Sequence, residues 1–403
     1  MKKIILMLFF PICIYGQSLK SALDKQDYNE VIRLLKDSLL INPNDSKLYC
    51  DLGHYYHYRA YDWRPLIGYK ESYSDSVLYF LEKAISLNSE YREPYYWLHA
   101  QYGARATEAI ENNQITKYKH EYQSAKDKGA MPKWLLEFAR NTLNSCDSDA
   151  ILFTYGDLTL NAISYIQLFE KHRKDVSVIP IGFCGSPSEA KLHKYGIKNI
   201  IKPVKIRFSD DQIMGMQPYP WDTLDVKVKF SSKLKHLYDL ETDYFTWRLA
   251  PDMTSKGSTY LSPWLALFAE IIEANQFERP IYFSVGFRKE ALAGLLPYTI
   301  NCGIVYKLVP FITKGSVFEM DTNVFEKVLL NKSSFVDFKD VEVNNFPNNS
   351  QILLNYHFAL WQLSEYYKKV GIKNKTAQLK EFIRNYISSD ILKTDTYLNG
   401  IKD

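Results

Sequence analysis

The sequence predicts a mixed fold in which α-helical repeats precede an α/β domain and a pair of helices follows it. Three observations support this fold class. Large aromatic and aliphatic residues recur at helical spacing between residues 27 and 132. From residue 150, short apolar runs alternate with amphipathic stretches, which is typical of a parallel sheet with helical crossovers. Residues 351–403 return to helical periodicity, after a polar, Asn-rich linker at residues 313–350.

Residues 1–16, MKKIILMLFFPICIYG, predict export. They begin with two lysines, continue with an apolar run and end at a small residue, Gly16, which is typical of a secretory signal peptide. Cys13 follows Ile12 rather than a small residue, so we do not expect a lipid anchor there. No later apolar run is long enough to span a bilayer. We therefore expect a periplasmic or secreted protein with no integral membrane span after cleavage.

Charge and cysteine content argue against a nucleic-acid-binding protein and against a zinc protein. The net charge of +4 comes from 50 basic and 46 acidic residues that are interspersed, which argues against a nucleic-acid partner. The remaining cysteines are widely spaced and form no CxxC pair, so we expect no zinc site and no cofactor. In an oxidising compartment they allow three disulfide pairings, but we favour small buried side chains. These cysteines are Cys50, Cys146, Cys184 and Cys302.

Residues 17–140 are predicted to form helical repeats. The segments SKLYCDLGHYYHY and EPYYWLHAQYG resemble the first helix of a tetratricopeptide repeat, with His99 where the first segment has Gly53. An aromatic insertion, AYDWRPLIGYKES at residues 60–72, separates the first units. Stacked repeats usually bind a peptide or protein on their concave surface, although the stack could instead only support the next domain. The residues expected to bind a protein are Tyr49, Tyr56, Tyr95 and Tyr102.

Residues 141–312 are predicted to form the α/β domain. The apolar run from Ile151 to Tyr155 ends at Gly156-Asp157, and an amphipathic helix follows. A second strand at residues 176–184 is expected to lie parallel to the first, because a helix connects them. A short helix is expected at residues 186–196. Further elements are expected as a helix at 262–277, strands at 279–287 and 303–310, and an inserted hairpin with long loops at 206–259.

Four segments of this domain resemble a known family over roughly residues 141–310. They are NTLNSCDSDAILFTYGD, EKHRKDVSVI, NQFERPIYFSV and GLLPYTINCGIVYKLVP, in this order. The family consists of polytopic membrane proteins, best known from Bacteroidota and related to protein O-mannosyltransferases, and the similarity is to its soluble tail. Its transferase chemistry belongs to a membrane-embedded part for which this sequence offers no counterpart, so the resemblance implies no catalysis here. The family usually continues as Gly-Asp-Asn-Asp, whereas this chain has Gly156-Asp157-Leu158-Thr159, so one of the two acidic residues is missing.

The loop after the first strand is the candidate ligand site. Open α/β sheets bind ligands at the carboxyl ends of their strands, and a helix N-terminus there offers N–H donors. The alternative, which we favour, is that Asp157 or Thr159 caps the helix. The candidate ligand-binding residues are Tyr155, Gly156, Asp157, Thr159 and Cys184.

Catalysis is not expected at this loop. Cys184 could act as a nucleophile only beside a base, and the nearest histidines, His172 and His193, occupy helix positions expected to face solvent. Arg279 is expected to pair with a carboxylate rather than to bind a free anion. The sequence thus predicts an exported, non-enzymatic scaffold with a protein partner in the cell envelope, linked by the resemblance to a glycan or secretion assembly. The alternative is a glycan-processing enzyme or sugar-binding module that uses the Gly156-Asp157 loop.

Overall fold

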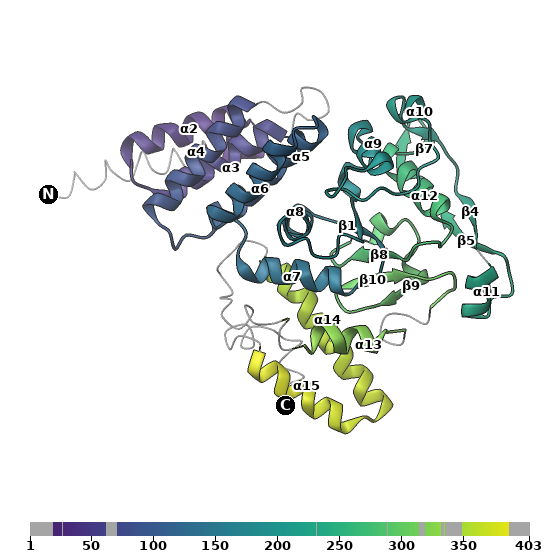
Figure 1. Ribbon diagram of the computed structural model, residues 1–403. Helices are drawn as coiled ribbons and strands as arrows, with labels where there is room; N and C mark the ends of the chain where they lie inside the picture. Colours follow the sequence, from purple (N-terminus) through teal and green to yellow (C-terminus); the bar gives the residue numbers. More distant parts are fainter. Residues whose placement is uncertain are drawn as a thin grey trace. The chain divides into compact units, whose positions relative to one another are not determined.

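A computed structural model describes residues 19–25, 27–61, 71–230, 232–287, 289–313, 319–331, 334 and 349–386. The predicted signal peptide and most of the aromatic insertion lie outside these residues. The chain forms two compact units that divide between Met131 and Pro132 (Figure 1). The predicted limit of the repeats, residue 140, falls within the first helix of the second unit.

The first unit consists of helices, as predicted. Each packs against the next along the chain. A Cβ atom placed on Gly53 would lie 2.5 Å from the side chain of Leu81, so a glycine lets helices α3 and α4 approach closely. His99, at the corresponding position of α5, is buried, and its Nδ1 lies 3.0 Å from the carbonyl oxygen of Ala130. The helices are α2 (Tyr28–Ile41), α3 (Ser46–Tyr61), α4 (Glu71–Leu87), α5 (Glu93–Glu111) and α6 (Ile115–Asp127).

The second unit is built on a five-stranded sheet with the order β2-β1-β8-β10-β9. Strand β1 lies parallel to β2 and to β8, as predicted. The prediction of a parallel sheet is wrong for the last two strands, because β10 runs antiparallel to both β8 and β9. The strands are β1 (Ile151–Thr154), β2 (Ser177–Pro180), β8 (Ile281–Ser284), β9 (Thr299–Asn301) and β10 (Val305–Leu308).

The direction of β10 follows from the segment that precedes it. Strands β8 and β9 run in the same direction, because β10 is antiparallel to both. Between β8 and β9 the described residues form only short 3₁₀ turns, at Lys289–Leu292 and Leu296–Tyr298. Strands β9 and β10 are then joined by a tight turn, in which Gly303 has a φ of +90° and the Cys302 N–H donates to the Val305 carbonyl. The turn therefore reverses the chain.

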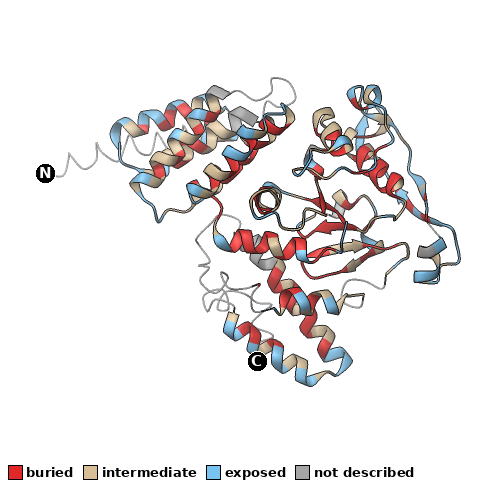
Figure 2. Cartoon of the chain, viewed as in Figure 1, coloured by how far each residue is buried: buried red, intermediate tan, exposed pale blue. Residues whose placement is uncertain are grey.

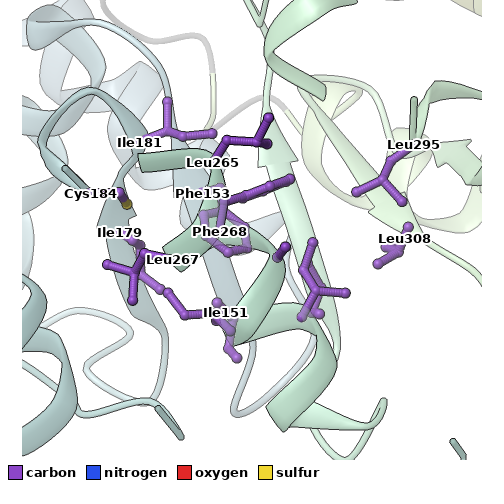
Figure 3. Close-up of a cluster of buried hydrophobic side chains, with 14 of the residues drawn as sticks. Ile151, Phe153, Ile179, Ile181, Cys184, Leu265, Leu267, Phe268, Leu295 and Leu308 are labelled. Carbon is purple, nitrogen blue, oxygen red and sulfur yellow. The ribbon is translucent and has the colours of Figure 1, made fainter. Parts of the chain in front are cut away.

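Helices cover the sheet and fill its core. Helix α8 (Asp157–Tyr165), continued by a π-helix at Ile166–Glu170, joins β1 to β2, and α12 (Pro263–Asn275) precedes β8. The two connections run in opposite directions across the sheet, so right-handed crossovers place α8 and α12 on opposite faces. On the α12 face the ring of Phe153 lies 4.8 Å from that of Phe268, between ring centroids (Figure 3). The centroid of the Phe283 ring lies 5.8 Å from that of Phe153.

The segment between β2 and α12 contains the expected hairpin. Strands β4 (Leu224–Lys229) and β5 (Tyr244–Leu249) pair antiparallel, and alternate residues of β5 are buried. A small sheet with the order β3-β7-β6 was not predicted. The other elements of the segment are α9 (Pro187–Tyr195), α10 (Asp210–Met214), β3 (Tyr219–Pro220), α11 (Ser232–Tyr238), β6 (Met253–Ser255) and β7 (Ser258–Leu261).

The described part of the predicted linker, mainly residues 319–331, and the described carboxyl helices belong to the second unit. Within the linker, α13 (Thr322–Val324) leads into a π-helix, Phe325–Leu329, in which Phe325 and Leu329 are fully buried. Figure 2 shows buried residues along one side of the two helices that follow. These are α14 (Asn349–Val370) and α15 (Lys373–Tyr386), and the first helix of the unit is α7 (Lys133–Asn144).

Helix α14 is anchored to α7 by a buried polar contact. The Asn141 side-chain amide donates to the Tyr356 hydroxyl at 2.8 Å. None of the helices in the described part of the chain combines the length and apolar character needed to cross a membrane.

Candidate functional site

Three glycines line the carboxyl edge of the parallel strands. Gly156 follows β1, Gly182 follows β2 and Gly286 follows β8. The strand register pairs Ile151 with Ser177 and with Ile281, so each glycine stands five residues beyond its paired residue, just past the end of its strand. A Cβ atom placed on any of them would meet nothing within 4 Å. The glycines therefore leave a row of accessible backbone, which we call the glycine row.

The glycine row lies where α/β sheets place ligands. The strand order reverses at β1, and open sheets bind ligands outside the carboxyl ends of the strands at such a reversal. Gly156 and Gly286 share a φ of +90°, which side-chain-bearing residues rarely adopt. The sequence pattern indicated Gly156 as part of a site but not Gly286. The missed signal is the run IYFSV, which ends at a glycine just as ILFTY does.

The candidate residues after β1 occupy different environments. Gly156 is the N-cap residue of α8 and has no side chain, so the favoured prediction that Asp157 or Thr159 caps this helix is wrong. Asp157 is exposed in the first turn, where its charge suits the helix dipole, and Thr159 is buried. The Tyr155 N–H donates to Ser284 Oγ at 3.3 Å, and its ring lies 5.4 Å from that of Phe287. Two aromatic rings and one carboxylate thus adjoin the glycine row.

The Cys184 side chain is buried, so its thiol is not accessible at this edge of the sheet. It is 1% exposed within the apolar cluster of Figure 3, and its Sγ donates to the Pro180 carbonyl at 3.5 Å. Burial raises the pKa of the Cys184 thiol, so the thiolate needed for nucleophilic attack is disfavoured. All four described cysteines are free and buried, as the favoured interpretation predicts. In the described part of the chain no group of His, Cys, Asp and Glu could hold a metal ion.

The two histidines nearest Cys184 in sequence have different surroundings. The expectation that His193 faces solvent is wrong, because it is 3% exposed on the buried side of α9. Its Nε2 lies 3.4 Å from a carboxylate oxygen of Glu189, one turn earlier. His172 is half-buried, and its Nε2 lies 2.8 Å from the side-chain oxygen of Asn144.

The four tyrosines predicted to bind a protein pack inside the first unit. The rings of Tyr49 and Tyr56 lie 6.2 and 5.4 Å from that of Phe80 in α4. Tyr102 is 5% exposed, so it offers little surface. Tyr95 is half-buried, and its ring would lie 3.1 Å from a Cβ atom on Gly129, after α6. The rings of Tyr49 and Tyr56 thus join α3 to α4, and the ring of Tyr95 contacts the turn after α6.

Other aromatic residues of α3 and α5 gather around Trp97. The ring of His54 stacks on Trp97 at 3.7 Å between centroids, and the ring of His57 lies 5.6 Å from Trp97. Tyr96 contacts Trp97 edge-on at 5.0 Å. All four side chains are half-buried. Burial lowers the pKa of His54 to about 4, so this ring is neutral at neutral pH. We call these four residues the Trp97 cluster.

Two arginines organise the opposite, amino-terminal edge of the sheet. Arg173 donates to the carbonyls of Leu143, Cys146 and Asp147 at 2.7–2.9 Å and pairs with Asp175 at 2.9 Å. Hydrogen bonds with Arg173 lower the pKa of Asp175 to about 2. Arg173 therefore ties the end of α7 to the segment that enters β2.

Arg279 acts in the same way at β8. Its guanidinium donates to the carbonyls of Asp149, Ala150 and Pro203 and to Ser177 Oγ, at 2.7–3.0 Å. It also lies 3.2 Å from the Asp149 carboxylate, which confirms the expected pairing. The quoted segments EKHRKDVSVI and NQFERPIYFSV thus contain structural arginines.

Comparison with known families agrees with this description of the second unit. Residues 135–187 and 191–327 match the family model described as TMEM260-associated domain 2. No curated protein and no solved structure matches the chain. The matched residues run from α7 to the π-helix at Phe325–Leu329 and include the sheet, both structural arginines and the glycine row. The second unit of this chain is therefore similar to a domain family tied to TMEM260.

Proposed function

We propose that the protein is an exported, non-enzymatic scaffold of the cell envelope whose first unit binds a partner protein. The observation that carries this proposal is the Trp97 cluster. Tryptophan and tyrosine are enriched where proteins bind one another, because their rings combine a large apolar area with few rotatable bonds. The cluster gathers such rings from two helices that the repeat pattern identifies as first helices of successive units.

The geometry of the helices supports the same proposal. Tetratricopeptide-like repeats line their concave surface with the first helix of each unit, which corresponds here to α3 and α5. The Trp97 cluster comes from these two helices, whereas Tyr49 and Tyr56 contact a ring of α4. The proposed binding residues are therefore His54, His57, Tyr96 and Trp97.

The test is a photo-crosslinking and binding experiment. A photoreactive phenylalanine analogue replaces Trp97 in one variant and Tyr79, a 61% exposed residue of α4, in the control. We expect one defined envelope protein to be crosslinked from position 97 and not from position 79. With that protein purified, Trp97→Ala should weaken binding by about tenfold or more, as for a central aromatic anchor.

Circular dichroism shows whether a loss of binding comes from a loss of folding. Trp97→Ala must retain the helical signal of the parent protein, and Tyr79→Ala must bind the partner like the parent. The scaffold proposal fails if the two positions give the same crosslinks, or if a folded Trp97→Ala variant binds the purified protein unchanged.

A second candidate function is sugar binding at the glycine row. Accessible backbone, the exposed Asp157 carboxylate and the paired rings of Tyr155 and Phe287 together offer polar and aromatic contacts to a hydroxylated ring. The link to envelope glycans rests on the family similarity.

Gly182→Val tests sugar binding. This substitution places a side chain in open space at a glycine whose φ is not positive, so it should block the glycine row without straining the backbone. If an array of envelope glycans identifies a ligand, Gly182→Val and Asp157→Asn should each weaken binding by about tenfold. Asp222→Asn, at an exposed residue of the inserted segment, is the charge-matched control. Binding unaffected by Gly182→Val would rule out this site.

A further inference from the structure

A cavity of about 420 Å³ lies at the start of β2, on the opposite edge of the sheet from the glycine row. One wall is the segment that enters β2, and the other is the turn that follows α9. Its volume is at the lower end of the range for small-molecule sites. The polar residues that line it are Gln167, Lys174, Tyr195, Lys198, Asn199 and Lys202.

The walls of the cavity are held by hydrogen bonds. The Gln167 amide donates to the carbonyls of Arg173 and Val176, both at 2.9 Å, which fixes the first wall. In the second wall, Ile197 and Ile201 exchange two backbone hydrogen bonds of 2.9 Å. The cavity therefore exists before any ligand binds.

Positive charge is concentrated around this cavity. Residues 171–205 contain eight lysines and arginines but two acidic residues, a net charge of +6, whereas the whole chain carries +4. The remainder of the chain is therefore slightly acidic. A concave surface with one sign of charge attracts ligands of the opposite sign.

Some of these cations already have acidic partners. Arg173 pairs with Asp175, and Lys194 with Asp210, both at 2.9 Å. Lys202 pairs with Asp149, which it shares with Arg279. Lys191 also lies within ion-pair distance of Asp210, and Lys205 of Glu278.

Among the described cations of this segment that have no acidic partner, Lys174 and Lys198 line the cavity, whereas Lys171 lies outside it. Lys174 donates to the Asn199 carbonyl at 2.6 Å, and this bond joins the two walls without neutralising the charge. Lys198 is exposed at the tip of the turn, and within the described residues neither lysine has a carboxylate within ion-pair distance. The cavity thus holds uncompensated positive charge.

We propose that this cavity binds a small molecule, about the size of a monosaccharide, through a phosphate or carboxylate group held by Lys174 and Lys198. Lysine ammonium groups bind such anions as point charges and donate up to three hydrogen bonds. Tyr195, whose ring is 60% exposed at the rim, offers a surface for the uncharged part of the ligand.

The test is calorimetric titration of the whole protein at low ionic strength with glucose 1-phosphate, glucuronate and glucose. We expect at least one of the two anions to bind and the neutral sugar not to bind. The anion that binds more tightly shows whether the cavity recognises a phosphate or a carboxylate group. Lys198→Gln should weaken that binding by about tenfold, because it removes a charged hydrogen-bond donor from a side chain that forms no hydrogen bond or ion pair with the described residues.

Two variants separate a specific site from a general field of positive charge. Lys171→Gln removes the same charge from the same basic segment, at an exposed residue outside the cavity, and should leave the affinity within about twofold. Lys198→Arg keeps the charge and should restore most of the affinity. The proposal is overturned if neither anion binds, if glucose binds equally well, or if Lys171→Gln weakens binding as much as Lys198→Gln.

Discussion

Replacing Arg279 with alanine should destabilise the second unit by about 3 kcal/mol or more, since removing a half-buried cation leaves several acceptors unsatisfied. The Arg279 guanidinium donates hydrogen bonds to Asp149, Ala150, Ser177 and Pro203. These residues lie at the starts of β1 and β2 and in the turn after α9. Three carbonyls and the Ser177 hydroxyl would lose a charged donor in a place that water reaches poorly. Urea denaturation followed by tryptophan fluorescence should show the loss as a lower midpoint.

Two other substitutions provide the comparison. Arg279→Lys keeps the charge, but a lysine cannot donate to acceptors on three segments at once. Its urea midpoint should therefore lie between those of the parent protein and Arg279→Ala. Arg248→Ala removes a guanidinium that is 70% exposed and lies 3.6 Å from Asp225, which should cost less than about 1 kcal/mol. Equal midpoints for Arg279→Ala and Arg248→Ala would contradict the structural role of Arg279.

The second large effect is expected for Gly196→Ala, at about 3 kcal/mol of lost stability from backbone strain and overlap together. Gly196 ends α9 with a φ of +67° and a ψ of 177°, a conformation available essentially only to glycine. A Cβ atom there would lie 2.6 Å from the Ile201 carbonyl oxygen and 2.7 Å from Pro203 Cδ. Both neighbours are backbone or ring atoms, which cannot rotate away. The measurement is again the urea midpoint.

Gly257→Ala is the matched control for this prediction. Gly257 has a similar φ of +81°, but a Cβ atom there would meet nothing within 4 Å. Its replacement should therefore cost only the backbone strain, about 1 kcal/mol. Close contact at Gly196 would not contribute to the loss of stability if the two alanine variants unfolded at the same urea concentration.

The sequence revealed those strands that are long apolar runs ending at a glycine. Ile151–Thr154 and Ile281–Ser284 both have this form, and the order of elements correctly indicated that the first two strands are parallel. Strand β9, Thr299–Asn301, has three residues and two polar side chains, so no periodicity exists to detect. It forms because the turn at Gly303 brings it against β10, which is tertiary information.

The candidate site was only partly predictable for a related reason. The glycine after β1 is visible in the sequence, but its alignment with Gly182 and Gly286 depends on strand register. Helix α9 buries His193 beside Ala190, so its inner face is partly polar and its apolar periodicity is weak. The repeat pattern correctly identified the segments of α3 and α5 as helices. It could not tell the rings that pack within a hairpin, such as Tyr56, from those that gather around Trp97.

The four buried thiols give the chain an internal reporter of its own fluctuations. Cys50, Cys146, Cys184 and Cys302 are each at most 6% exposed, so a thiol-reactive reagent can reach them only when the surrounding structure opens. Cys50 lies in the first unit and the other three lie in the second. The rate at which each cysteine becomes modified therefore measures how often its own unit opens, without any introduced label.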